Sequence, residues 1–188
     1  MNAGDGDKDD AALIAAALNG DNASFSALMT RHKDALYRFI RRYVGDADES
    51  FDLMQETFVA SWSALNTFES GRPFSVWLRR IALNKCRDWS RRRQVRRFFF
   101  GASPLEAADS APLTNAPDDS AHEERLAALD AAVAALPAQL KEPLLLTVFE
   151  HLSQAEAASL LGISAKAVET RVYRAKQRLR EALSDEQS

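Results

Sequence analysis

The stretch His151–Leu183 reads HLSQAEAASLLGISAKAVETRVYRAKQRLREAL and decides the fold of the second half of the chain. Ser153 followed by Glu156 is the pattern of a capping box, which satisfies free backbone amides at a helix start. Gly162 stands where a turn needs positive φ, and Ser164 is suited to cap a second, longer helix. The stretch therefore predicts a helix-turn-helix, a unit whose second helix lies in a DNA major groove.

The second of these helices divides into an apolar side and a basic side. Its apolar residues recur at helical spacing and form a narrow docking stripe: Val168, Val172, Ala175 and Leu179. Residues 164–180 include six Lys or Arg and one acid, Glu169. On the other side of the helix line up the residues expected to face base edges and phosphates: Ala167, Thr170, Arg171, Arg174 and Arg178. A solvated basic helix at the end of an all-α domain is the alternative.

The charge of the chain is unevenly distributed. The 188 residues are 46% hydrophobic, enough for real cores, and the net charge is −3. Residues 79–97 hold nine Lys or Arg against one acid, a formal charge of +8, so the remainder carries −11. A basic patch on an acidic chain indicates DNA contact at a limited site rather than general coating of nucleic acid.

Cysteine usage and the N-terminus limit the class of protein. The single cysteine, Cys86, excludes an intramolecular disulfide and a multi-cysteine metal site. The N-terminal MNAGDGDKDD is acidic and lacks the apolar core of a signal peptide, and no apolar run approaches the length of a membrane span. We therefore expect a cytoplasmic protein with no metal, no cofactor and no membrane insertion.

The first half of the chain predicts four helices, and no strand-like alternation persists anywhere. Residues 1–10 are polar and charged, so we expect them to be disordered, with Asp9 or Asp10 capping the first helix. The expected helices are Ala11–Leu18, a second from near Asn22 or Ser24 to about Val44, Asp48–Leu65 and Phe74–Arg93, with Asn66–Pro73 as a loop.

Acidic side chains crowd the first half of the third predicted helix: Asp48, Glu49, Asp52 and Glu56, with Gln55 among them. Clustered carboxylates bind metals or do acid–base work, but no histidine or glycine-shaped loop accompanies these. A solvated face, stabilisation of the helix N-terminus and an acidic docking face for a basic partner stay open. The buried side is expected to hold Phe51, Met54, Phe58, Trp62 and Leu65.

The fourth predicted helix combines aromatic and basic side chains. Its core side is Trp77, Leu78, Ile81, Ala82, Cys86 and Trp89, and its polar face is Arg80, Asn84, Arg87, Asp88 and Arg91. Aromatic rings beside arginines suit single-stranded nucleic acid, where bases stack and arginines follow phosphates. Aromatic residues at helical spacing are also typical of a core, which is the alternative.

Residues 98–121 change in character. They contain three prolines and several acids, and no Lys or Arg occurs between Arg97 and Arg125. This composition predicts a linker between two domains. The triplet Phe98–Phe100 is unusual there, and either seals the first domain or contacts a partner. The second domain begins near His122, with Pro137 at the first turn of its second helix and Pro143 either kinking or delaying that helix.

Three motifs in this order resemble bacterial RNA polymerase sigma factors of the extracytoplasmic-function (ECF) group of the sigma-70 family, over Ala12–Leu183. They are DLMQETFVASW (Asp52–Trp62), FSVWLRRIALNKCRDWSRRR (Phe74–Arg93) and the run from Leu136 to Leu183. The resemblance implies an all-α fold of two small domains: a sigma region 2-like domain over 11–97 and a region 4-like helix-turn-helix domain over 122–184, joined by a flexible linker over 98–121.

The resemblance also implies a division of labour among the residues. Asp52, Gln55 and Glu56 would dock on the β′ clamp helices of core RNA polymerase, and the second domain would meet the β flap. The melted −10 element would be held by Phe68, Arg80, Asn84, Arg87, Asp88, Arg91 and Arg92. The duplex −35 element would be read by Lys166, Ala167, Thr170, Arg171 and Arg174. An anti-sigma factor is an implied partner.

The expected function is a promoter-specificity subunit, without enzyme activity, that directs transcription initiation of a stress or envelope-response regulon. Ala167 and Glu169 leave the −35 sequence undetermined, since Glu169 either accepts from cytosine or repels phosphate. A conventional helix-turn-helix regulator, binding duplex DNA as a dimer, is the alternative. A nuclease using Asp48–Glu56 is disfavoured, because the histidines are scattered and no nucleophile–base or glycine-rich phosphate motif appears.

Overall fold

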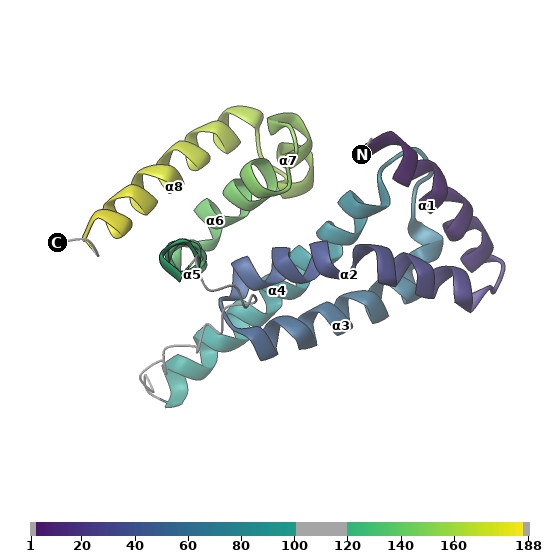
Figure 1. The fold of residues 1–188 in the computed structure, drawn as a ribbon, viewed down its shortest axis with the longest axis horizontal. Coiled ribbons are helices and arrows are strands. Elements are labelled where there is room, and N and C mark those ends of the chain that lie inside the picture. The colour runs from purple at the N-terminus through teal and green to yellow at the C-terminus, as the bar shows by residue number, and fades with distance from the viewer. Residues whose placement is uncertain (1–2, 101–119, 186–188) are drawn as a thin grey trace. The chain divides into compact units, whose positions relative to one another are not determined.

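The computed structural model describes residues 3–100 and 120–185, and every regular element within these ranges is helical (Figure 1). The predicted all-α fold is confirmed. The elements are α1 (Ala3–Leu18), α2 (Asn22–Val44), α3 (Ala47–Ala64), the 3-10 turn η1 (Leu65–Thr67), α4 (Phe74–Phe100), α5 (Ser120–Ala135), α6 (Ala138–Leu144), the π-helical turn η2 (Leu145–Phe149), α7 (Gln154–Leu161) and α8 (Ala165–Asp185). Among the described helices, none combines the length and apolar character that a membrane crossing requires.

The chain divides into two compact units, one of Met1–Ile40 with Asp48–Arg92 and the other of Arg41–Ala47 with Arg93–Ser188. The predicted linker over 98–121 differs from the structure at both ends. Residues 98–100 continue α4, and α5 begins at Ser120, ahead of the expected His122. Residues 101–119 of that predicted linker lie outside the described residues.

Helix α1 begins at Ala3 rather than Ala11, so the prediction of disorder over residues 1–10 is wrong for residues 3–10. Met1 and Asn2 lie outside the described residues. Asp10 is a buried residue within the helix and not its cap. Its carboxylate accepts from Arg31 Nη1 at 2.6 Å and lies 2.7 Å from His32 Nε2, both on α2. A buried carboxylate needs such partners, and here they hold α1 against α2.

Helix α2 begins at Asn22, as predicted, with Asp21 as the side chain that caps it. The Ala23 amide donates to Asp21 Oδ1 at 3.0 Å, and Ser24 Oγ donates to Asp21 Oδ2 at 2.6 Å. The hydrogen bond from Ser24 and then that from the Ala23 amide hold the pKa of the Asp21 carboxyl below its usual value. The cap therefore favours the ionised form of Asp21.

The predicted buried side of α3 is confirmed for Phe58 and, just after the helix, for Leu65, but not for its other two large rings. Phe51 and Trp62, expected inside, are 51% and 41% exposed. Thr57 Oγ1 donates to the Leu53 carbonyl at 2.6 Å and Ser61 Oγ to the Phe58 carbonyl at 2.8 Å, so their buried hydroxyls are satisfied within the helix. Small hydroxyl side chains therefore share the buried side, while the partly exposed Trp62 ring lies 4.7 Å from the ring of Phe25 on α2. The buried residues are Ser50, Leu53, Thr57, Phe58 and Ser61.

Helix α4 buries an apolar side and is joined to α3 by polar contacts. Trp89 Nε1 donates to Glu49 Oε2 of α3 at 2.8 Å. Trp77 and Ile81 were predicted in this core but are only half-buried. The helix continues past the predicted end at Arg93 because no Gly or Pro occurs between Phe74 and Phe100. The buried residues of α4 are Phe74, Leu78, Ala82, Leu83, Cys86 and Trp89.

In the second unit, α5, α6 and α7 pack against α8. Pro137 occupies the N-cap position of α6, one residue before the first turn that was predicted for it. Pro143 lies inside α6, where it lacks the N–H that would bond the carbonyl one turn earlier. The spacing of the backbone hydrogen bonds then widens from four residues to five. The Glu150 N–H, for example, donates to the Leu145 carbonyl at 3.0 Å. Pro143 thus changes the helix type without ending the helical path.

The helix-turn-helix is present as predicted. The amide and Oγ of Ser153 donate to Glu156 Oε2 at 2.8 and 2.6 Å, and the Glu156 amide donates back to Ser153 Oγ at 3.2 Å. Gly162 has φ 69° and ψ 35°, the left-handed conformation in which glycine carries no steric penalty. The Ala167 amide donates to Ser164 Oγ at 3.1 Å, which caps α8. Val168 and Ala175 of α8 are fully buried.

Candidate functional site

A hollow of about 550 Å³ opens beside α4 in the first unit, and we call it the α4 hollow. Arg80 and Asn84 line it from α4, and Phe68 lines it from the segment after η1. Helical spacing places Arg80 and Asn84 on one side of α4, whereas Phe68 reaches the hollow because η1 turns the chain back. The structure thus brings together three of the seven residues predicted for melted DNA.

Aromatic rings form one wall of the α4 hollow. The ring centroids of Phe68 and Trp77 are 5.6 Å apart, and those of Phe74 and Trp77 are 5.5 Å apart. Phe74 is buried, while Phe68 and Trp77 are half-buried and line the hollow. Such a wall can stack on a base, Asn84 offers both a donor and an acceptor, and Arg80 offers positive charge. The hollow is chemically suited to an unpaired base.

The remaining predicted residues of α4 lie farther along the helix and do not line the hollow. Arg87 and Arg91 follow Asn84 at helical spacing on the same side of α4. Asp88 accepts from Arg91 Nη2, an exposed pair one turn apart. Arg92 is twelve residues after Arg80, which turns it about a third of a revolution away. Three of the seven predicted residues therefore line the hollow, and Arg87 and Arg91 continue from it along the same side of α4.

The exposed side of α3 carries Asp52, Gln55 and Glu56, together with Val59, and we call it the α3 acidic face. Glu56 Oε2 lies 3.2 Å from Lys85 Nζ of α4. Val59 is 69% exposed and follows Gln55 and Glu56 at helical spacing, a signal that the sequence contains. Within the described ranges, no three His, Cys, Asp or Glu side chains are placed to hold a metal ion. The face is suited to a partner with basic and apolar side chains.

The N-terminal half of α8 presents polar side chains outward. Lys166, Thr170 and Arg174 are exposed, while Ala167 and Arg171 are half-buried. Lys166 Nζ lies 2.8 Å from Glu169 Oε2, so the charge of Glu169 is balanced locally. Tyr173 was absent from the predicted set, yet it is 60% exposed and follows Lys166 by seven residues, on the same side. Its spacing from Lys166 could have identified it.

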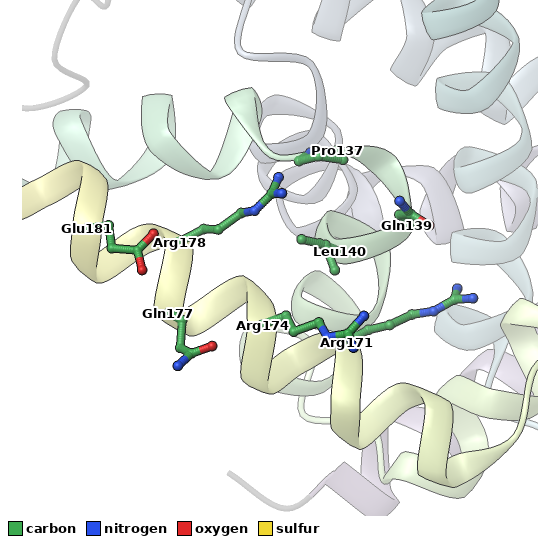
Figure 2. A pocket seen from close by; sticks show the side chains of 8 residues that line it. All are labelled: Pro137, Gln139, Leu140, Arg171, Arg174, Gln177, Arg178 and Glu181. Carbon is green, nitrogen blue, oxygen red and sulfur yellow. The ribbon is translucent and has the colours of Figure 1, made fainter.

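A second hollow, of about 450 Å³, lies between α8 and the start of α6, and we call it the α8 hollow (Figure 2). Arg171, Arg174 and Arg178 line it from α8, opposite Pro137 and Leu140. Figure 2 shows Arg178 extending from α8 toward Pro137. Two of the five residues predicted for duplex DNA, Arg171 and Arg174, therefore lie on the flank of α8 that meets the hollow.

Family models match parts of both units. The model described as Sigma-70 region 2 matches residues 28–96, and that described as Sigma-70, region 4 matches residues 126–179. RNA polymerase sigma factor NccH of Alcaligenes xylosoxydans xylosoxydans is 40% identical over 95% of this chain and 96% of its own. ECF RNA polymerase sigma factor SigE of Mycolicibacterium smegmatis is 34% identical over 90% of this chain and 66% of its own.

A solved structure shows the same fold with a partner. It is the sigma factor RpoE of Bartonella quintana in complex with the anti-sigma factor NepR. RpoE aligns with a TM-score of 0.70 and 25% sequence identity, covering 85% of this chain and 96% of its own. The similarity therefore extends over both halves of the chain.

Proposed function

Because the chain belongs to the ECF group of the sigma-70 family of RNA polymerase sigma factors, which direct transcription, we propose that it recognises each promoter as two DNA elements in two different states. The −10 element is held as melted DNA by the first unit. The −35 element is read as duplex DNA by α8 of the second unit. The protein has no active site of its own in this proposal.

The observation that carries the proposal is the α4 hollow. An unpaired base that leaves the stack costs a few kcal/mol, which contacts in a pocket must offset. Phe68 and Trp77 offer rings for stacking, and Asn84 offers an amide that can read a base edge. A duplex-binding regulator has no need of such a hollow. Arg80, Arg87, Arg91 and Arg92 then follow the backbone, with Asp88 orienting Arg91.

The −35 element is assigned to the outward side of α8. Lys166, Ala167, Thr170, Arg171 and Arg174 are its proposed contacts, because arginine pairs with guanine in two hydrogen bonds and lysine binds phosphates. The capping box of α7, the turn at Gly162 and the Ser164 cap fix the angle at which α8 leaves the unit. A fixed angle is what a groove-entering helix needs.

Core polymerase is assigned to the α3 acidic face. Asp52, Gln55 and Glu56 dock on the β′ clamp helices in this proposal, with Val59 adding apolar contact. The second unit meets the β flap. An anti-sigma factor, the kind of partner that RpoE of Bartonella quintana has in its solved complex, holds the protein inactive. Release of the protein from the anti-sigma factor then activates a stress or envelope-response regulon.

Reconstituted transcription tests the proposal. The purified chain is added to bacterial core polymerase on fragmented DNA from the source organism, and transcript starts are mapped by sequencing. We expect discrete chain-dependent starts that share paired upstream elements. Tight duplex binding by the chain alone, without such starts, would instead identify a conventional helix-turn-helix regulator. Omitting the chain is the control for core polymerase starting at DNA ends.

A further inference from the structure

The C-terminal end of α4 presents aromatic rings to solvent. Phe98 is 84% exposed and Phe99 73% exposed, and Val95 one turn earlier is 54% exposed. The two rings contact each other edge to face, with centroids 5.5 Å apart and planes at 87°. We call the segment from Arg91 to Phe99 the α4 tip. Large exposed apolar side chains grouped on one helix mark an interaction surface.

The α4 tip is also strongly basic. From Trp89 to Phe100 the chain holds five arginines and no acid. Arg91, Arg92 and Arg96 are exposed beside the two phenylalanines. Asp88, one turn before, pairs with Arg91. Positive charge around flat rings complements a polyanion that carries rings of its own.

Helix geometry places Phe98 in line with the α4 hollow. Phe98 follows Arg80 by 18 residues, which at about 100° per residue returns it to the same side of the helix after about five turns. It follows Asn84 by 14 residues, or about 21 Å along the axis. Arg87 and Arg91 lie between them on that side. Since no Gly or Pro interrupts α4, the helix itself sets this alignment.

We propose that the α4 tip binds single-stranded DNA, continuous with the strand whose base enters the α4 hollow, and that Phe98 stacks on one of its unpaired bases. The inference rests on the proposed function of the hollow. Duplex DNA is a poorer occupant, because its bases already stack on one another and leave no face for a ring. Phe99 packs edge-on against Phe98 and holds the stacking ring in place.

Open-complex lifetime tests the proposal with the full chain bound to core polymerase. On a promoter mapped by transcription with the wild-type chain, Phe98→Ala with Phe99→Ala is expected to shorten the lifetime roughly tenfold or more, since stacking on one base is worth that much. Phe98→Tyr keeps a ring and is expected to retain the lifetime, whereas Phe98→Leu keeps apolar bulk and is expected to lose it. An unchanged lifetime in the double variant overturns the proposal.

Photo-cross-linking identifies the occupant directly. With p-benzoylphenylalanine in place of Phe98, the cross-link is expected on the unpaired strand of the open complex. A cross-link to a polymerase subunit, to duplex DNA or to a second copy of the chain overturns the proposal. These failures are distinct from failure of the proposed function, in which the wild-type chain would produce no promoter-dependent starts at all.

Discussion

Helices α4 and α8 are both rich in arginine, but they offer DNA opposite kinds of surface. α4 carries Arg80 and Asn84 beside a hollow with an aromatic wall. α8 carries Lys166, Thr170 and Arg174 on an outward side that a capped turn supports. A hollow can accept a base that has left its stack, whereas an outward helical side can enter a groove of intact duplex. Under the proposed function, the same residue type serves two DNA states.

The two units also differ in the face they offer to proteins. The α3 acidic face combines two carboxylates with an exposed valine, and no comparable acidic side exists on α8 within its described residues. Under the proposed function, negative charge on α3 serves protein binding and positive charge on α8 serves DNA binding. The following variants break or sharpen this separation.

Reversing the charge of the α3 acidic face is expected to have the largest effect. Asp52→Lys with Glu56→Lys places positive charge against a basic partner and also against Lys85, and like charges facing each other cost several kcal/mol. Affinity for core polymerase, measured by fluorescence titration, should fall about a hundredfold or more. Asp34→Lys, on an exposed position of α2, is the control for charge reversal itself. Full retention of affinity would remove α3 from the docking surface.

Removing the Asn84 side-chain amide from the α4 hollow is expected to have the second-largest effect. Asn84→Ala should slow formation of the open complex by about tenfold to a hundredfold, because a base that has left its stack loses a hydrogen-bonding partner worth about 1–3 kcal/mol. Binding to a −35 duplex fragment should not change. Equal losses in both measurements would indicate misfolding and not a recognition role for Asn84.

On α8, the exposed Arg174 should matter more than the half-buried Arg171. Arg174→Ala is expected to weaken binding to a −35 duplex by about 1–3 kcal/mol if it contacts a base. Arg171→Ala should mainly reduce the salt dependence, as loss of a phosphate contact does. The measurement is holoenzyme binding to the duplex across a salt series. No change in either variant would place the DNA on another side of α8.

Loss of the capping box is expected to have the smallest effect. Ser153→Ala should lower the free energy of unfolding by about 1 kcal/mol, because the Glu156 amide loses the hydroxyl oxygen that accepts its hydrogen bond. Thermal unfolding followed by circular dichroism is the measurement. Ser153→Thr keeps the hydroxyl and should retain most of the stability.

The same cap predicts a pH dependence. The hydrogen bonds from the Ser153 side chain and amide lower the pKa of Glu156 in the folded protein. This contribution to stability is fully present above the ordinary pKa of the carboxyl and is lost as the pH falls through the lowered one. The pKa of Asp21 at the start of α2 is also lowered in the folded protein, so its contribution to stability is lost in the same direction of pH. Ser153→Ala should therefore reduce the acid sensitivity, while Asp21→Asn removes a separate part of it.

The sequence predicts best those features whose causes are local. Ser153, Glu156 and Gly162 act within a few residues of one another, so their pattern alone is sufficient to place α7 and the turn. The arrangement of Arg80 and Asn84 on one side of α4 is equally local. Phe68 enters the same hollow only through the path of η1, which spacing does not reveal.

Features that depend on distant residues were missed. Asp10 is held by Arg31 and His32, more than twenty residues away, so its polar surroundings in sequence suggested disorder instead. On α3, hydrophobicity favoured burial of Phe51 and Trp62. Hydroxyl groups such as that of Thr57 took the buried side because helix carbonyls satisfied them. Composition alone predicts neither the pairing of Asp10 with α2 nor the burial of hydroxyl side chains on α3.

The burial of Cys86 makes this protein a convenient subject for labelling. Its side chain is fully enclosed in the core of α4, and a thiol shielded in this way reacts slowly with maleimides. A cysteine introduced at an exposed position therefore carries a dye almost alone, without prior removal of a native thiol. Asp34→Cys and Ala182→Cys, at exposed positions outside the proposed DNA surfaces, would place one dye on α2 and one on α8. Energy transfer between them would then follow, molecule by molecule, how the spacing of the two units changes when a promoter is added.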